Sequence, residues 1–475
     1  MSEVAAITNS EATIKVPHVI QGRTDIGHAV THHSRDLGGA FTTAELKLNE
    51  LVWSRLEQGP AFDMPVAEII DFLIETGRHL NIKNNRYLQE AATAAVKASP
   101  LGRRIVENTY NDLAHIFSRN ALEAEVAVIG AEVLDGWQKT TSGGLHRVRA
   151  FPPRMLHIPA GNSPVVSALT IARGALCKGV HLIKLPSNDL FSATAILRTM
   201  ADIDPQHPVV RSFSAAYWRG GDERIEANLY RAQYFDKVVA WGGEASMRHI
   251  QKYIGPGLEL VSFDPKTSFS LIGREAFASE ESLRDAAVRA ADDVKVFNQD
   301  ACVCSRFQFV EGSVEEVDRF CALQIAALGE DAHYGDGVGP VPPKEVREEI
   351  EMLGMLEPVY RVFGSFDGRG VIVRSDEPVG FHPIGKVVNV VPVKSLAEGV
   401  ARANVATQTV GVYPPSRKAE LRNALASAGV QRIVPLGGAV EGGMGHPHDA
   451  FYPLQRFVRW VSDEGSDEGS DEGTD

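Results

Sequence analysis

One cysteine in this sequence stands where a nucleophile could be held. Cys302 closes the run Asn298-Gln299-Asp300-Ala301-Cys302, between a stretch with helical spacing near 281–296 and an apolar strand expected at 306–310. At such a junction backbone N–H groups can stabilise a thiolate, which attacks thioesters and aldehydes. Two other interpretations stay open: a buried pair with Cys304, or half of a metal site. No further Cys or His flanks the run at the spacing a zinc site needs.

An amide donor follows an earlier apolar strand. Asn162 comes just after a strand expected at 155–158 and leads into a helical stretch. Its side-chain N–H groups could stabilise an oxyanion as it develops. The simpler alternative, which local spacing favours, is that Asn162 caps the helix.

Three further strand ends carry residues typical of nucleotide sites. Lys184 ends an apolar strand at 181–185, and glycine pairs follow the strands at 215–218 and 238–241. These pairs are Gly220 with Gly221, and Gly242 with Gly243. The carboxyl ends of parallel strands bind nucleotides, and glycine lets the backbone approach a phosphate. No complete dinucleotide fingerprint is present, so ordinary turns and a solvated lysine remain the alternative.

The elements that must position these residues follow a clear pattern. Residues 43–130 have helical spacing, whereas from about residue 153 short apolar runs alternate with helical stretches. That alternation is typical of parallel sheets built from βαβ units, and it occurs twice. With 475 residues the chain is too long for one core, so we expect two α/β domains in tandem.

Composition excludes several classes of protein. The net charge is −13, of which seven acidic residues lie at 462–475, leaving about −6 for the rest. We expect that tail to be disordered, either as a solubilising segment or as a docking arm. With no basic cluster, nucleic-acid binding is not expected. No apolar stretch is long enough for a membrane span and no secretory signal is visible. Four cysteines in so long a chain make no disulfide scaffold, which favours the cytoplasm.

Taken in order, these pieces resemble the LuxC family, the fatty-acyl (acyl-CoA) reductases of the aldehyde dehydrogenase superfamily. The resemblance covers roughly residues 135–460. The matching runs are 157–164, 184–189, 217–222, 238–243, 264–266, 298–302 and 434–437, together with His448-Asp449.

The resemblance implies an aldehyde dehydrogenase-like α/β fold with two Rossmann-like domains and a small β segment for bridging and oligomerisation. We expect a nicotinamide-cofactor-binding domain at 1–137, with its N-terminal helical region, and 154–272. A catalytic domain with Cys302 would occupy 273–435. The bridging segment would occupy 138–153 and 436–461, and the tail 462–475.

The resemblance also assigns roles to residues. Cys302 would be the nucleophile, and Asn162 with the Cys302 N–H would form the oxyanion hole. Lys184 would reach the cofactor ribose, the strand end at Gly220 and Gly221 would lie beside it, and Gly242 and Gly243 would face the pyrophosphate. Aldehyde dehydrogenases often carry a glutamate three residues beyond that lysine, which repels a 2′-phosphate. Here the residue is Ser187, which favours NADP(H) over NAD(H).

The position of a general base is ambiguous. If Leu258-Glu259-Leu260 matches the Leu-Glu-Leu of oxidising aldehyde dehydrogenases, Glu259 is the base that activates water. If Asp264-Pro265-Lys266 matches their Gly-Gly-Lys, Ser262 falls at that position and no base is present. We prefer the second match because the apolar strand at 269–272 then follows in register.

The implied activity is NADPH-dependent reduction of a long-chain acyl-CoA or acyl-protein thioester to the aldehyde, through an acyl-enzyme on Cys302. One alternative is an oxidising aldehyde dehydrogenase with Glu259 as base. Another is a catalytically silent subunit that scaffolds acyl transfer. The family implies an acyl-activating ligase and an acyltransferase as partners, and a homo-oligomer.

Overall fold

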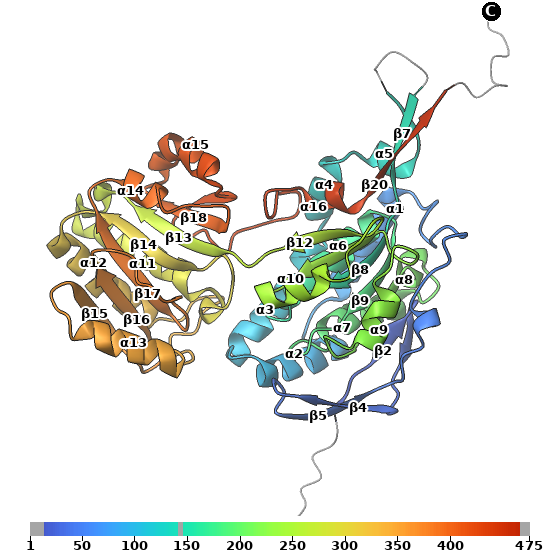
Figure 1. Ribbon diagram of the computed structural model, residues 1–475, viewed down its shortest axis with the longest axis horizontal. Coiled ribbons are helices and arrows are strands. Elements are labelled where there is room, and N and C mark those ends of the chain that lie inside the picture. Colours follow the sequence, from blue (N-terminus) through green and yellow to red (C-terminus); the bar gives the residue numbers. More distant parts are fainter. Residues whose placement is uncertain (1–13, 141–145, 466–475) are drawn as a thin grey trace, which may run out of the picture.

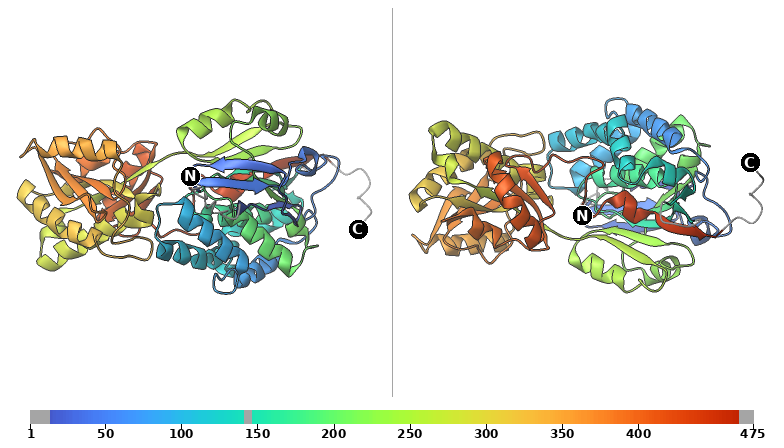
Figure 2. Two further views of the ribbon diagram at one scale, coloured as in Figure 1. Left: turned by 90° about the horizontal axis from the view of Figure 1, so that it is seen from below. Right: turned by 90° about the horizontal axis from the view of Figure 1, so that it is seen from above.

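The computed structural model describes residues 14–140 and 146–465, which form two α/β units side by side (Figure 1). The two units stay separate along the long axis of the molecule when it is viewed from below and from above (Figure 2). A small antiparallel sheet extends from the unit that contains the first half of the chain (Figure 1). This is the tandem α/β arrangement that the sequence predicts.

The first unit contains a seven-stranded sheet in the order β12-β11-β8-β9-β10-β2-β3. Its five parallel strands are β8 (Arg154–Ile158), β9 (Val180–Lys184), β10 (Phe213–Ala216), β11 (Lys237–Trp241) and β12 (Glu259–Phe263). β2 (His18–Ile20) and β3 (Arg23–Asp25) continue the sheet antiparallel. The chain runs from β8 outward to β10 and then places β11 on the other side of β8. Strand order therefore reverses between β8 and β11, and open α/β sheets bind ligands at the carboxyl ends beside such a reversal.

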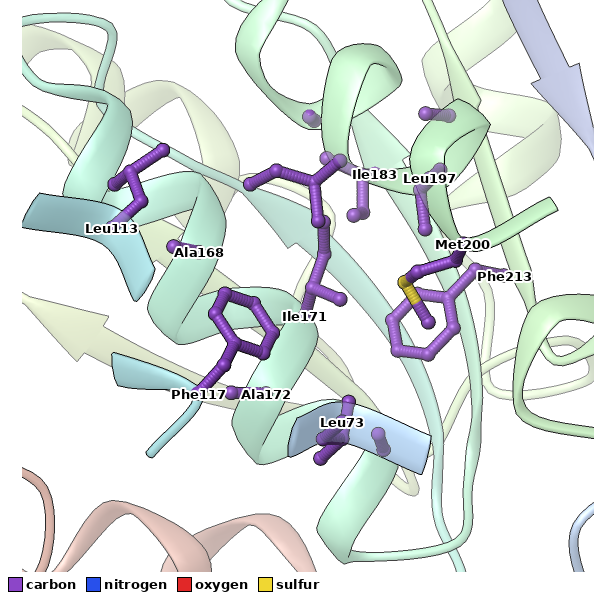
Figure 3. Close-up of a cluster of buried hydrophobic side chains, with 14 of the residues drawn as sticks. Leu73, Leu113, Phe117, Ala168, Ile171, Ala172, Ile183, Leu197, Met200 and Phe213 are labelled. Atoms are coloured by element: carbon purple, nitrogen blue, oxygen red, sulfur yellow. The ribbon is translucent and has the colours of Figure 1, made fainter. Parts of the chain in front are cut away.

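Helices cover both faces of this sheet because its strands are apolar on both sides. On β9, Ile183 packs among Leu113, Ile171 and Met200 in one core (Figure 3), whereas Leu182 packs into a core on the other face. The first core is covered by α1 (Val66–His79), α2 (Arg86–Ala98), α3 (Arg103–Ile116), α4 (Arg119–Ala127), α6 (Pro164–Leu176) and α7 (Ser192–Ile203). The second is covered by α9 (Glu223–Leu229) and α10 (Glu244–Gln251).

The N-terminal region is helical only in part. The helices α1 to α4 lie within the stretch with helical spacing, but residues 14–43 form short strands instead. Three of them pair as a sheet: β1 (Ile14–Lys15), β5 (Gly39–Thr43) and β4 (Val30–Ser34). The turn between β4 and β5 reaches the edge of the first unit where β9 ends, because Asp36 on this turn contacts Ser187.

The second unit contains a seven-stranded sheet in the order β15-β16-β17-β14-β13-β18-β19. Its strands are β13 (Thr267–Ile272), β14 (Ser305–Glu311), β15 (Tyr360–Ser365), β16 (Gly370–Ser375), β17 (Val387–Val393), β18 (Thr407–Tyr413) and β19 (Arg432–Pro435). All pairs are parallel except β15 with β16. α11 (Glu280–Lys295) and α12 (Val314–Leu328) cover one face. α13 (Lys344–Gly354), α14 (Leu396–Val400) and α15 (Lys418–Ala428) cover the other.

Two expected boundaries need correction. The first unit was expected to extend to residue 272, but β13 pairs with β14 and β18 in the second sheet. An apolar strand does not by itself show which sheet it joins. The tail was expected to be disordered from residue 462, but β20 (Arg459–Glu464) pairs with β7 (His146–Phe151). Backbone hydrogen bonds order this part despite its acidic side chains. The rest of the tail, at 466–475, lies outside the described residues.

β20, β7 and β6 (Gln138–Lys139) form the three-stranded sheet that extends from the first unit. β6 and β7 lie in the first expected bridging segment, whereas β20 begins in the second and continues beyond residue 461. Among the described residues, no helix is both long and apolar enough to cross a membrane.

Candidate active site

Cys302 lies in the loop between the short helix η3 (Val296–Gln299) and β14, directly beyond the end of α11. The three residues Phe297, Asn298 and Gln299 have φ values of 48°, 51° and 71°, in the left-handed region that costs energy for side chains with a Cβ. Such a conformation persists only where its surroundings impose it. The loop that carries the cysteine is therefore held in one shape.

Side-chain amides impose that shape. Asn298 exchanges two hydrogen bonds of 3.0 Å with Asp336, donating to its carboxylate and accepting from its backbone N–H. The buried Gln299 does the same with the backbone of Val387, donating at 2.6 Å and accepting at 3.1 Å. These contacts explain the two amide residues that precede the cysteine in sequence: they brace the loop.

The first unit also supports this loop. On α3, Arg104 donates to the carbonyl oxygens of Ala332 and Gly335, and Asp112 accepts from Tyr334. The carbonyl of Tyr334 in turn accepts from the Phe297 N–H at 2.6 Å. A helix of the first unit is thereby linked, through residues 332–336, to the loop that carries the cysteine.

The half-buried Cys302 has a mixed electrostatic environment. Burial raises the pKa of its thiol. A hydrogen bond from the Gln408 side chain lowers it, the charge of Asp449 raises it, and the N–H groups of Cys302 and Val303 lower it. The carbonyl of Cys302 accepts from the Ser268 hydroxyl at 2.7 Å. The thiol therefore has donors that can stabilise a thiolate.

Cys304 has a different role. It is fully buried, its thiol donates to the Val296 carbonyl at 3.1 Å, and burial raises its pKa to about 12. A thiol held protonated in this way is a poor nucleophile. All four cysteines are free thiols, so Cys302 and Cys304 do not form a disulfide.

Asn162 does not cap α6. The cap is Ser163, whose hydroxyl accepts from the Val165 N–H, with Pro164 in the first helical turn. The Asn162 amide instead donates to the Asp300 carbonyl at 3.1 Å, across a sequence separation of 138 residues. The structure thus brings Asn162 from the carboxyl end of β8 to the loop of Cys302.

Lys184 lies at the same edge of the first sheet, at the end of β9. Its ammonium is 5.7 Å from the ring centre of Trp218 and close to the backbone of Gly220. Burial lowers the pKa of Lys184 to about 8, and the charge of Glu226 partly offsets this. Glu226 itself accepts from the Gly221 N–H at 3.1 Å and contacts His249 at 2.6 Å.

The structure explains glycine differently in the two glycine pairs. Gly221 has a φ of 85°, so its turn requires glycine whether or not a ligand binds. Gly242 and Gly243 have ordinary φ values, but a Cβ on Gly243 would meet no atom within 4 Å. Gly243 is also the cap of α10 and offers no side-chain cap to its N–H groups. The open space at Gly243 and the uncapped N–H groups at the start of α10 lie beside the reversal of strand order. This arrangement suits a phosphate.

Ser187 has a partner that the sequence did not suggest. Its hydroxyl donates to the Asp36 carboxylate at 3.1 Å, over 151 residues of sequence. A carboxylate therefore stands beside the position at which this chain lacks the glutamate of aldehyde dehydrogenases.

Glu259 is not placed to serve Cys302, which corrects its assignment as a base. It begins β12 and lies in register with Lys237, at the amino ends of the strands. Asn162 instead follows the carboxyl end of β8. With about 3.3 Å per residue, β12 separates it from the carboxyl edge by roughly 13 Å. Burial would raise the pKa of Glu259, but hydrogen bonds from Lys237 and Arg456 outweigh burial and lower it. Its oxygens are engaged at 2.5 and 2.7 Å.

Sequence reasoning missed Gln408, Asp449 as a neighbour of the cysteine, and Asp36. Gln408 lies within a buried strand between two threonines and carries no local signal. The His448-Asp449 pair was visible in the sequence, but nothing in its spacing connected it with Cys302.

The chain is similar to known proteins over most of its length. The family described as "Acyl-CoA reductase (LuxC)" matches residues 61–460. A "Long-chain acyl-protein thioester reductase" of Vibrio harveyi is 28% identical over 418 residues, covering 85% of this chain and 83% of that protein. The protein of that name in Photorhabdus luminescens is 31% identical over 322 residues, covering 67% of this chain and 65% of its own length.

Solved structures show the fold. An NAD-dependent aldehyde dehydrogenase from Sinorhizobium meliloti has a TM-score of 0.72 at 12% identity, covering 96% of this chain and 95% of that one. An NADP-dependent glyceraldehyde-3-phosphate dehydrogenase from Bacillus halodurans C-125, complexed with NADP, has a TM-score of 0.70 at 14% identity, covering 95% and 100%. The chain therefore has the aldehyde dehydrogenase fold and belongs to the acyl-CoA reductase (LuxC) family.

Proposed function

We propose that this protein reduces a long-chain fatty acyl thioester to the aldehyde, with a nicotinamide cofactor and an acyl-enzyme on Cys302. The observation that carries the proposal is the braced loop of Cys302 with the Asn162 amide at its backbone. Asn162 comes from the first unit and Cys302 from the second, and the hydrogen bond from Asn162 to the Asp300 carbonyl supports a shared site at the carboxyl edge, where open α/β sheets bind ligands.

In the first step the Cys302 thiolate attacks the thioester carbonyl carbon. The Asn162 amide and the Cys302 N–H stabilise the tetrahedral oxyanion, and the thiol of the donor leaves to give the acyl-enzyme. The nicotinamide cofactor, when bound, supplies the hydride that reduces the acyl group. The same two donors then hold the oxyanion of the thiohemiacetal until it collapses to the aldehyde and frees Cys302.

Reduction fits this site better than hydrolysis. An oxidising aldehyde dehydrogenase needs a base that activates water at the acyl-enzyme. Glu259 is bound to Lys237 and Arg456 at the far edge of the sheet, and Ser262, near the carboxyl end of β12, is no base. Without that base the thioester survives long enough to be reduced.

We propose NADPH as the reductant, with Lys184 at its ribose, Gly220 and Gly221 beside it and Gly242 and Gly243 at its pyrophosphate. The uncharged Ser187 supports NADPH. Asp36 opposes it, because it takes the Ser187 hydrogen and adds a negative charge. Asp36 is thus the residue at which the preference can be tested.

A small cavity lies beside Asn162. It lies between α2, α3 and the β8–α6 loop, with a volume of about 30 Å³, which is room for roughly one water molecule. Apolar side chains on its wall include Ala95, Leu101, Val106 and Phe297. We propose that the acyl group is delivered to Cys302 from CoA or from a carrier protein. The relatives named above, which act on acyl-protein thioesters, support a protein as donor.

Three expectations about context remain proposals. They are a homo-oligomer, partnership with an acyl-activating ligase and an acyltransferase, and a cytoplasmic location.

An assay of the purified chain with acyl-CoA of several lengths, and with NADPH and NADH in parallel, tests the proposal. We expect long-chain aldehyde as the product and a loss of reduced cofactor in equal amount. Fatty acid with no loss of reduced cofactor would indicate hydrolysis, and no turnover with any donor would favour a scaffold. Glu259→Gln should leave the ratio of aldehyde to fatty acid unchanged, whereas a base at Glu259 would make that ratio rise.

A further inference from the structure

One carboxylate of the second unit contacts both the first unit and the loop that carries Cys302. It belongs to Asp336, in the connection between α12 and α13, and 16% of its side chain is exposed. One oxygen accepts from the Gly102 N–H and from the Asn298 amide, both at 3.0 Å. The other oxygen accepts from the Arg104 guanidinium at 3.2 Å. Both oxygens are therefore engaged, and their partners come from different units.

A glycine allows the carboxylate to approach the first unit. Gly102 is the residue before α3, and it offers this helix no side-chain cap. A Cβ on Gly102 would lie 2.7 and 2.9 Å from the two carboxylate oxygens of Asp336, closer than side-chain contacts allow. The start of a helix carries unpaired N–H groups and a partial positive charge, which favour a carboxylate. Asp336 thus supplies, from the second unit, an acceptor that the glycine cannot provide.

The main chain of Asp336 is held separately from its side chain. The buried Lys386 ammonium donates to the carbonyl oxygens of Asp336 and Gly337 at 2.8 and 2.9 Å. The Asp336 N–H donates to the Asn298 amide oxygen at 3.0 Å. Removing the carboxylate leaves these main-chain partners in place. A substitution at Asp336 therefore probes the side chain without releasing the segment that carries it.

Asn298 connects this carboxylate with the proposed reacting groups. It lies in a turn in which the Asp300 N–H donates to the Phe297 carbonyl at 2.9 Å, and its φ of 51° is in the left-handed region. The Asp300 carbonyl in turn accepts from the Asn162 amide at 3.1 Å. Hydrogen bonds therefore lead from Asp336, through Asn298 and its turn, to the Asn162 amide.

We propose that Asp336 is a positioning residue: its carboxylate holds the start of α3 and the Asn298 side chain together, and so fixes the Cys302 loop relative to the Asn162 amide. This inference rests on the proposed function of Cys302 and Asn162. Because a displacement of about 1 Å at the reacting atoms can cost roughly 100-fold in rate, a carboxylate outside the site can control acylation.

The test compares two reactions of Cys302 in the full chain, each followed by mass spectrometry of the peptide that contains residue 302. Acylation by long-chain acyl-CoA without reductant needs aligned oxyanion donors, whereas alkylation by iodoacetamide forms no oxyanion. At saturating acyl-CoA, Asp336→Ala should slow acylation about 10- to 100-fold and leave the alkylation rate within about two-fold of wild type. The acyl-CoA concentration that gives half the maximal rate should not change.

Asp331→Ala is the matched control. The Asp331 carboxylate accepts from the Gly337 N–H at 2.7 Å and lies 3.3 Å from Arg104, so it shares a partner with Asp336. Among the described residues it has no hydrogen bond to Asn298. Asp331→Ala should therefore be acylated at the wild-type rate.

A double-mutant cycle shows whether Asp336 acts through Asn298. If it does, adding Asp336→Ala to Asn298→Ala should slow acylation by less than about two-fold more, whereas independent effects would multiply. Two further variants probe the contact with α3. Gly102→Ala, whose Cβ displaces the carboxylate, should slow acylation. Asp336→Asn, which keeps one acceptor oxygen, should lie between Asp336→Ala and wild type.

Wild-type acylation in Asp336→Ala would overturn the inference. An equal fall in Asp331→Ala, multiplying effects in the cycle, or a comparable change in alkylation would also overturn it. Circular dichroism identifies a variant that does not fold. If Asp336→Ala does not fold, Asp336→Asn and Gly102→Ala decide: slower acylation with unchanged alkylation in both supports the inference, and any other result contradicts it. No acylation of wild type would instead overturn the proposed function, and this inference with it.

Discussion

The loop of Cys302 and the cofactor edge of the first sheet are built in opposite ways. In the loop, three consecutive residues adopt a strained backbone and buried amides lock them to Val387 and Asp336. At the edge, Gly242 and Gly243 have ordinary backbone, and Gly243 faces open space. Under the proposed function, the chain fixes the reacting atom in advance and leaves room where the cofactor must enter.

The largest expected effect comes from removing the donor that spans the two units. Asn162→Ala should lower kcat about 100- to 1000-fold, because one oxyanion donor is lost in the transition state. KM for the acyl donor should change little, since the ground-state carbonyl needs the donor less. Steady-state kinetics of aldehyde formation measure both. Equal activity in the variant would mean that Asn162 only braces the Asp300 carbonyl.

The next prediction tests whether the loop is braced for chemistry. Gln299→Leu leaves the N–H and C=O of Val387 without these partners, at a cost of about 1–3 kcal/mol for each group. We expect both lower stability and slower acylation of Cys302. Gln308→Leu is the matched control: Gln308 is equally buried, lies in the sheet to which Val387 belongs, and bonds Ala290 and Gln324 instead. Gln308→Leu should lower stability without slowing the acylation of Cys302. A similar fall in its acylation rate would show that general destabilisation explains the effect of Gln299→Leu.

At the carboxyl end of β9, the lowered pKa of Lys184 predicts that cofactor affinity depends on pH. With a pKa of about 8, Lys184 is charged below that pH and neutral above it. Cofactor affinity should therefore fall roughly several-fold between pH 8 and 9, as the ammonium loses its proton. Lys184→Arg, which stays charged, should bind equally over this range. Fluorescence titration without acyl donor gives Kd directly, and a flat profile in the wild type would place Lys184 away from the cofactor.

The smallest effect concerns the choice between the two cofactors. Asp36→Asn removes a charge beside Ser187 while keeping a hydrogen-bond acceptor. The ratio of kcat/KM for NADPH to that for NADH should rise a few-fold, because a 2′-phosphate is no longer repelled. Glu50→Gln, an exposed acid elsewhere in the N-terminal region, serves as control. An unchanged ratio in Asp36→Asn would show that Asp36 does not act on the 2′-phosphate of the cofactor.

Local sequence patterns predicted the features that depend on residues close together in the chain. The alternation of strands and helices predicted two α/β units, and the helix–strand junction at 296–306 drew attention to Cys302. Contacts over long separations could not be predicted in this way. Asn162 meets Asp300 over 138 residues and Ser187 meets Asp36 over 151, and neither partner carries a local signal. The sheet to which β13 belongs is likewise decided by pairing with β14 and β18.

We propose that Cys302 carries the acyl group, and acyl labelling tests this role most directly. The full chain is incubated with radiolabelled long-chain acyl-CoA without reductant, and the bound label is located by peptide mapping. Wild type and Cys304→Ser should carry hydroxylamine-sensitive label on the peptide containing residue 302, since Cys304 is buried and held protonated. Cys302→Ser should carry no such thioester and form no aldehyde. Thioester label or aldehyde production retained in Cys302→Ser would contradict the account.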